Sequence, residues 1–148
     1  MLEINQAGLS WLTILRKRET LRRAYDAFDV GRVAGFAETE RARLLADPGV
    51  IRHRLKVDAA IHNAGAVLEM RRTAGSFAAW LDAHHPRTPE GWTRVFRSVF
   101  RFTGGEITRS FLIATGYLPG AHDPACPVYA EVLRRRPAWS TAGDTPRG

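Results

Sequence analysis

The sequence FRFTGGE (Phe100–Glu106) begins at the end of the amphipathic segment Glu90–Arg101 and is followed by a second helical segment, Ile107–Gly116. Two consecutive glycines break a helix and let the chain turn tightly, which predicts a helix, a hairpin and a second helix. The backbone N–H groups of such a hairpin form an anion cradle together with the N-terminus of the second helix. A DNA phosphate suits this cradle, held by Thr103, Gly104 and Gly105. The alternative is an ordinary turn between two helices.

The rest of the sequence also has helical spacing of apolar residues, and no β alternation of useful length is present. We therefore predict an all-α fold, a helical bundle that contains this helix-hairpin-helix. A single domain is expected over residues 1–139, followed by a disordered tail over residues 140–148. The remaining predicted helical segments are Glu3–Arg18, Glu19–Phe28, Gly31–Phe36, one capped by Thr39 and ended by Pro48-Gly49, Ile51–Arg72, one capped by Ser76, and Pro127–Arg135.

Composition excludes several classes of protein. The chain has 148 residues and one cysteine, Cys126, which argues against a disulfide-stabilised secreted domain. No apolar run approaches the length of a membrane helix, and residues 1–11 lack the pattern of a signal peptide. We therefore expect a cytoplasmic protein. The net charge of +7 favours a polyanionic partner such as nucleic acid.

Part of this charge is concentrated at the start of the predicted helix Ile51–Arg72. Arg52, Arg54 and Lys56 lie in its first turns, where cations oppose the helix dipole. We interpret them as contacts to the DNA backbone, with an exposed, solvated face as the alternative.

The N-terminal stretch LEINQAGLSW (Leu2–Trp11) resembles the Leu-Glu-x-x-Gln-Ala-Gly-Leu-Ser-Trp signature of the DNA-3-methyladenine glycosylase I family. These are base-excision repair enzymes of the helix-hairpin-helix type. The similarity is strong again over LLADPGVIRHRLKV (Leu44–Val57), includes the Phe-x-Phe-x-Gly pattern at Phe100–Gly104, and extends to about Cys126.

This resemblance implies an enzyme that hydrolyses the N-glycosidic bond of 3-methyladenine in alkylated double-stranded DNA, acting as a monomer. Such an enzyme extrudes the damaged base into a pocket. Glu3 is expected to be the catalytic, base-recognising carboxylate and Trp11 the stacking aromatic, with Gln6 packed or hydrogen-bonded nearby. If residues 3–18 form one helix, both side chains lie on nearly the same face of it. The alternatives are a helix-dipole partner for Glu3 and a core position for Trp11.

The family also has a structural zinc site built from an N-terminal Cys and His and a C-terminal His and Cys. His122 and Cys126 resemble the second pair, and no Cys or His precedes Trp11. A partial zinc site is therefore the expectation. Asp123 lies where related glycosylases place a catalytic aspartate, but it also precedes Pro124, as in many turns.

Two other interpretations remain. The chain starts with helical spacing and no capping residue, so a missing upstream segment or a late-assigned start is one expectation. The other is a catalytically silent DNA-binding remnant that keeps the hairpin without a complete pocket.

Overall fold

The computed structural model describes residues 1–141, and the secondary structure of that part is entirely helical. The prediction of an all-α fold is therefore confirmed. The α-helices are α1 (Leu2–Gln6), α2 (Trp11–Arg16), α3 (Arg18–Ala24), α4 (Val30–Ala34), α5 (Glu38–Ala46), α6 (Arg54–Ala74), α7 (Phe77–His84), α8 (Pro89–Val99), α9 (Gly105–Ala114), α10 (Tyr129–Arg134) and α11 (Ala138–Thr141). A short 3₁₀ turn covers Asp26–Phe28.

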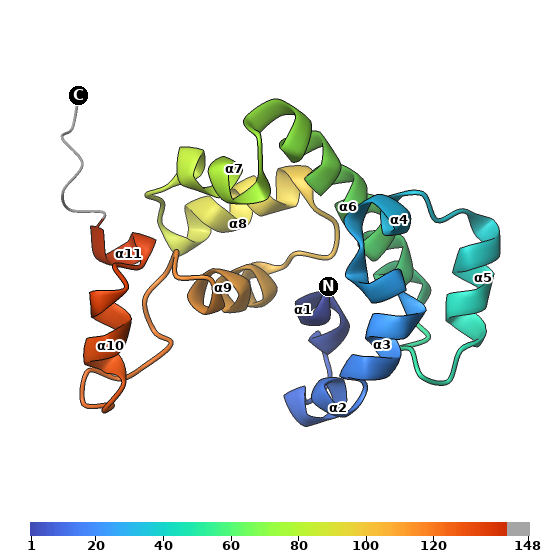
Figure 1. The fold of residues 1–148 in the computed structure, drawn as a ribbon, viewed down its shortest axis with the longest axis horizontal. Helices are drawn as coiled ribbons and strands as arrows, with labels where there is room; N and C mark the ends of the chain where they lie inside the picture. The colour runs from blue at the N-terminus through green and yellow to red at the C-terminus, as the bar shows by residue number, and fades with distance from the viewer. Residues whose placement is uncertain (142–148) are drawn as a thin grey trace.

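The long helix α6 connects two lobes (Figure 1). Its first half packs with α3, α4 and α5 around one apolar core, and its second half packs with α7, α8 and α9 around another. Tyr25 and Leu44 are fully buried in the first core, and Trp92 and Leu112 in the second. Helix α1 lies between the lobes and contacts both α6 and α9. The two lobes thus meet at the helix that carries Glu3.

The prediction of a single helix over residues 3–18 is wrong. Gly8 takes a φ of +76°, a left-handed conformation that glycine adopts without the Cβ penalty of other residues. Two residues later Ser10 caps α2, where its hydroxyl accepts the N–H of Thr13 at 3.2 Å. Gly8 and Ser10 therefore end one helix and begin another, so Glu3 and Trp11 are on different helices.

Of the other predicted helix boundaries, some are confirmed and others are wrong. Asp29 caps α4 and Ser76 caps α7, as expected. Thr39 is not a cap, because α5 already begins at Glu38. The segment predicted as one helix over residues 19–28 breaks at Tyr25, after which the next three residues all have positive φ. At the C-terminus, residues 140 and 141 belong to α11, and the remainder of the predicted tail, 142–148, lies outside the described residues.

Candidate active site at the junction of the lobes

The predicted helix, hairpin and second helix are present as α8, residues 100–104 and α9. Asn63 of α6 holds the hairpin at its start: its amide donates to the carbonyl of Arg101 at 3.0 Å, and its side-chain oxygen accepts the N–H of Arg101 at 2.8 Å. The neighbouring His62 ring nitrogen is 3.1 Å from the carbonyl oxygen of Val99. The hairpin is thus fixed to the long helix at two successive points.

Gly104 is the N-cap of α9 and Gly105 is its first residue. A Cβ added at Gly104 would meet no atom within 4 Å, and one at Gly105 would be 3.8 Å from the nearest, Thr93 Oγ1. Space therefore does not require glycine at either position, and the start of α9 is open to an approaching group. Thr103 is largely buried, and its hydroxyl donates to the carbonyl of Phe100 at 3.2 Å. Only the backbone of Thr103 is then left to contact a phosphate.

A groove along α9 brings Glu3 and Trp11 together, although they lie on separate helices. Glu3 comes from α1 and Trp11 from the first position of α2. Trp11 is 38% exposed, so its ring is not a core side chain. The α9 side of the groove is formed by Glu106, Arg109, Ser110, Ile113 and Ala114. The arrangement offers an aromatic face and a carboxylate to one ligand.

The carboxylate of Glu3 is held in an unusual electrostatic state. Its Oε2 atom is buried and has no hydrogen-bond partner among the described residues. Burial raises the pKa of Glu3 above its ordinary value, and the nearby amino group of Met1 and hydroxyl of Ser110 oppose this effect. A buried acceptor without a donor costs folding free energy unless a ligand supplies the donor. Glu3 is therefore suited to accept a hydrogen bond from a bound molecule.

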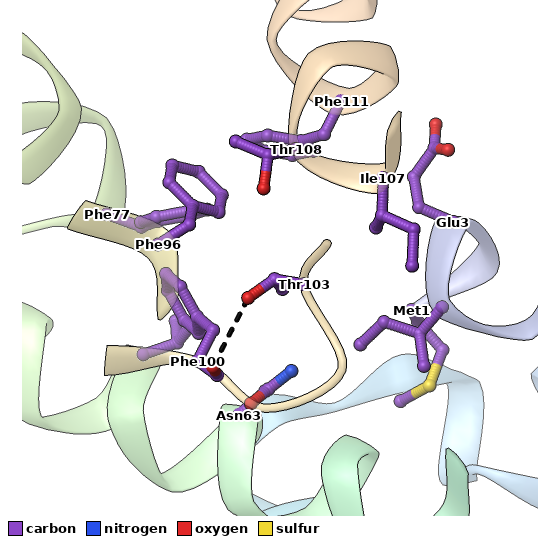
Figure 2. Close-up of a pocket in the computed structure, with 12 residues that line it drawn as sticks. Met1, Glu3, Asn63, Phe77, Phe96, Phe100, Thr103, Ile107, Thr108 and Phe111 are labelled. Atoms are coloured by element: carbon purple, nitrogen blue, oxygen red, sulfur yellow. Dashed lines mark hydrogen bonds between the residues drawn. The ribbon is translucent and has the colours of Figure 1, made fainter. Parts of the chain in front are cut away.

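Glu3 also borders a second, mainly apolar cavity, and Figure 2 shows its side chain beside Ile107 at the edge of this space. The far wall consists of the rings of Phe77, Phe96, Phe100 and Phe111. Thr108 faces the same space; it is fully buried, and its hydroxyl has no partner among the described residues. The carboxylate thus stands between an open groove and an apolar cavity, which explains its desolvation.

Sequence reasoning did not find Ser110 or Thr108 as part of this site. Both lie on α9 within two turns of the hairpin, and their position just after the two glycines is a sequence signal for them. For Ser110 a second signal is the resemblance of Ser110-Phe111 to the family, which assigned this residue no role. The four phenylalanines were missed as cavity residues because aromatic residues at helical spacing are usually core residues.

Comparison with known proteins agrees with this geometry. The family model described as methyladenine glycosylase matches residues 1–95. The DNA-3-methyladenine glycosylase 1 of Escherichia coli K12 is 35% identical to this chain, over 86% of the chain and 78% of the relative. The chain belongs to the methyladenine glycosylase family.

Solved structures of 3-methyladenine DNA glycosylase I have the same fold as this member of the family. A glutamate-to-glutamine variant of the Staphylococcus aureus enzyme superposes with a TM-score of 0.77 at 30% identity, covering 85% of this chain and 77% of that one. A tyrosine-to-phenylalanine variant in complex with 3-methyladenine gives the same TM-score, identity and coverage. The helix-hairpin-helix architecture of the methyladenine glycosylases thus extends to this chain.

The prediction that Lys56 contacts the DNA backbone is wrong for this member of the family. Lys56 is only 5% exposed, and its ammonium donates to the carbonyls of Asn5 at 2.9 Å and Ala7 at 2.6 Å. The side chain points into the protein because these carbonyls lie at the end of α1. Arg52 and Arg54 do reach the surface; Arg52 precedes α6, and the guanidinium of Arg54 is 3.8 Å from the carboxylate of Asp58.

Gln6 supports the turn between α1 and α2. Its side-chain amide donates to the carbonyl of Leu9 at 2.9 Å. This contact spans Gly8 and helps to set the angle between the two helices. Gln6 is not among the side chains that line the groove, so it acts near the site rather than in it.

His122 and Cys126 are close together, with 3.7 Å between the sulfur and the Nδ1 atom of the imidazole. Structural zinc sites typically need four protein ligands. Among residues 1–141, no group of three or more His, Cys, Asp or Glu side chains could hold a metal ion. The described residues therefore do not fit a closed zinc site. Asp123 accepts the N–H of Ala125 at 2.8 Å through its side chain, which supports its interpretation as a turn residue.

Proposed function

We propose that this chain is a DNA glycosylase that releases 3-methyladenine from alkylated DNA. The observation that carries the proposal is the pairing of a buried, unpartnered carboxylate oxygen of Glu3 with the half-exposed ring of Trp11 in one groove. The family and the relative bound to 3-methyladenine support the same activity.

The chemistry suits these two side chains. An adenine methylated at N3 carries a positive charge while it is attached to the sugar. An aromatic face binds such a ring by stacking and cation–π attraction, and a carboxylate complements its charge and accepts hydrogen bonds from its exocyclic amine. Water attacks the anomeric carbon of the sugar, the bond from this carbon to N9 breaks, and its electron pair neutralises the ring. Because the leaving base is already activated, no strong acid is required.

Double-stranded DNA would approach the start of α9. The N–H groups of Thr103, Gly104 and Gly105 supply donors for a phosphate, and the helix dipole of α9 favours the same anion. Arg52 and Arg54 and the net charge of +7 add sequence-independent attraction. These contacts hold the duplex, and base extrusion then delivers the damaged base to Glu3 and Trp11.

A silent DNA-binding remnant is the second candidate. It is favoured by the exposure of Trp11, whose side chain is only partly covered by the described residues. The two candidates predict different outcomes when this protein is incubated with duplex DNA that has been treated with a methylating agent. An enzyme releases free 3-methyladenine, detected by chromatography, with multiple turnovers. A remnant binds the duplex with steep salt dependence and releases no base above the background.

The proposal also covers the location, the oligomeric state and the zinc content of the protein. We propose a cytoplasmic monomer, in which any zinc bound through His122 and Cys126 needs donors beyond these two. No helix among the described residues is long and apolar enough to cross a membrane. Light scattering and metal analysis of the purified chain test the monomer and the zinc content.

A further inference from the structure

Lys56 is a buried cation at the centre of the molecule that the proposed chemistry does not use. It projects from the first turn of α6 and is 5% exposed. No carboxylate among the described residues pairs with it; its partners are the carbonyls of Asn5 and Ala7. Burying a charge without a counter-ion is costly, and an apolar residue would fill the same space more cheaply. The position of this cation therefore calls for a reason other than packing.

The partners of Lys56 lie between Glu3 and Trp11 in the sequence. Asn5 and Ala7 form the end of α1, where unpaired carbonyls concentrate negative partial charge. The ammonium binds the C-terminal end of α1, immediately before the left-handed Gly8 that separates α1 from α2. Two local hydrogen bonds bridge Gly8, from the N–H of Leu9 to the carbonyl of Gln6 at 2.7 Å and from the side-chain amide of Gln6 to the carbonyl of Leu9 at 2.9 Å. Lys56 adds a tertiary contact from α6 to these local ones, on the turn that joins the helices of Glu3 and Trp11.

The same ammonium also faces the hairpin. It lies 5.9 Å from the ring centroid of Phe102, within the range of a cation–π interaction. Phe102, which directly precedes Thr103 in the hairpin, has a φ of +58°. One cation therefore contacts both the turn of the base pocket and the loop that would hold the DNA phosphate.

We propose that Lys56 is a positioning residue for base excision, whose ammonium holds the α1–α2 turn, and hence Glu3 relative to Trp11, against Phe102 of the hairpin. This inference rests on the proposed function. It gives a role to a lysine at a position where a methionine of similar length would avoid the cost of desolvation.

The test compares Lys56→Met, Lys56→Arg and Lys17→Met. Lys17 is the matched control, because its ammonium also donates to a backbone carbonyl, that of Pro48 at 2.8 Å, but away from the groove. A small displacement of reacting groups lowers a rate by up to about 10²-fold. We expect Lys56→Met to lower kcat for base release by roughly 10- to 100-fold, with KM for the alkylated duplex changed by less than about threefold. Lys56→Arg should recover part of this loss, and Lys17→Met should resemble the wild type.

A kcat of Lys56→Met equal to that of the wild type would overturn the proposal, as would an equal loss in Lys17→Met. If Lys56→Met shows no cooperative unfolding transition, that variant is not folded, and kcat is measured for Phe102→Leu instead. It removes the ring but leaves both carbonyl contacts, and it should lower kcat about threefold or more at an unchanged melting temperature. An unchanged kcat in that variant contradicts the link to the hairpin.

A separate readout distinguishes failure of this inference from failure of the proposed function. The indole N–H signal of Trp11 in ¹⁵N spectra reports the geometry of the α1–α2 turn without any catalysis. It should shift in Lys56→Met and stay in place in Lys17→Met, even if the wild-type chain releases no base. A shift in neither variant rejects the positioning role, whatever the activity.

Discussion

Glu3 and Trp11 line one groove from two helices whose relative direction is set by Gly8. Glu3 is held at the junction of the lobes by the contacts of α1 with α6 and α9, whereas Trp11 begins α2 and is 38% exposed. The carboxylate is therefore partly desolvated at a packed junction, whereas the aromatic ring is accessible to a ligand. This division of roles leads to separate predictions for the two residues.

The first prediction concerns stability. Burial raises the pKa of Glu3 in the folded protein, so its ionised form lowers the free energy of unfolding at pH values above that pKa. Glu3→Gln removes the charge, and we expect its free energy of unfolding at neutral pH to exceed that of the wild type. The difference should shrink as the pH falls and wild-type Glu3 becomes protonated. Urea unfolding at several pH values measures it, with Glu19→Gln at an exposed position of α3 as the control. A Glu3→Gln variant less stable than the wild type at neutral pH would contradict the desolvation of this carboxylate.

The same shift predicts the pH dependence of activity. Recognition of a cationic base needs ionised Glu3, and a raised pKa means that this form is lost at a higher pH than for an ordinary glutamate. In the pH profile of kcat/KM, the midpoint of the acidic limb should therefore lie at a higher pH than the usual pKa of a carboxylate. Measured rates of base release between mildly acidic and neutral pH locate the limb. A limb at the ordinary glutamate value would mean that Glu3 is solvated in the free enzyme.

Trp11 should contribute to binding with little effect on stability. Stacking on an aromatic ring contributes about 1–3 kcal/mol per base. We expect Trp11→Ala to weaken the binding of free 3-methyladenine by at least about fivefold, and Trp11→Phe to retain most of the affinity. Isothermal titration with the free base measures both. The matched control is Leu15→Ala, since Leu15 is an exposed apolar residue of the same helix. Equal losses in Trp11→Ala and Leu15→Ala would remove Trp11 from the pocket.

The hairpin can be tested by removing a single N–H group. Gly105 is the first residue of α9, a position that tolerates proline, and Gly104 has the extended conformation that precedes proline, with φ −68° and ψ 172°. Gly105→Pro should keep the fold and lower the affinity for undamaged duplex by about tenfold, the value of one hydrogen bond to a charged group. Gly105→Ala keeps the N–H group and should bind like the wild type, because the added Cβ has room. If both variants bind equally, the phosphate does not contact this N–H group.

Much of the fold followed from the sequence, since apolar spacing and capping residues such as Asp29 and Ser76 are local signals. The break at Gly8 did not, because the apolar residues on both sides of it continue one helical pattern, and a left-handed glycine resembles a tolerated one in sequence. Lys56 was misplaced for a related reason. A basic run predicts an exposed face, and only the tertiary structure shows that one of its members turns inward toward the end of α1.

The site itself was predicted in outline. Glu3 and Trp11 were identified from a resemblance to the family. They do line one groove, but from two helices and not from the single helix that the sequence predicted. The contributions of Ser110 and Thr108 depend on how α9 packs against α1, which no local pattern encodes.

The central claim is that Glu3 recognises the damaged base, and the single-turnover rate of 3-methyladenine release from alkylated duplex DNA tests it most directly. The account predicts measurable release by the wild-type chain and a rate at least about 100-fold lower for Glu3→Gln, with duplex binding unchanged. Release by Glu3→Gln at the wild-type rate would contradict the account.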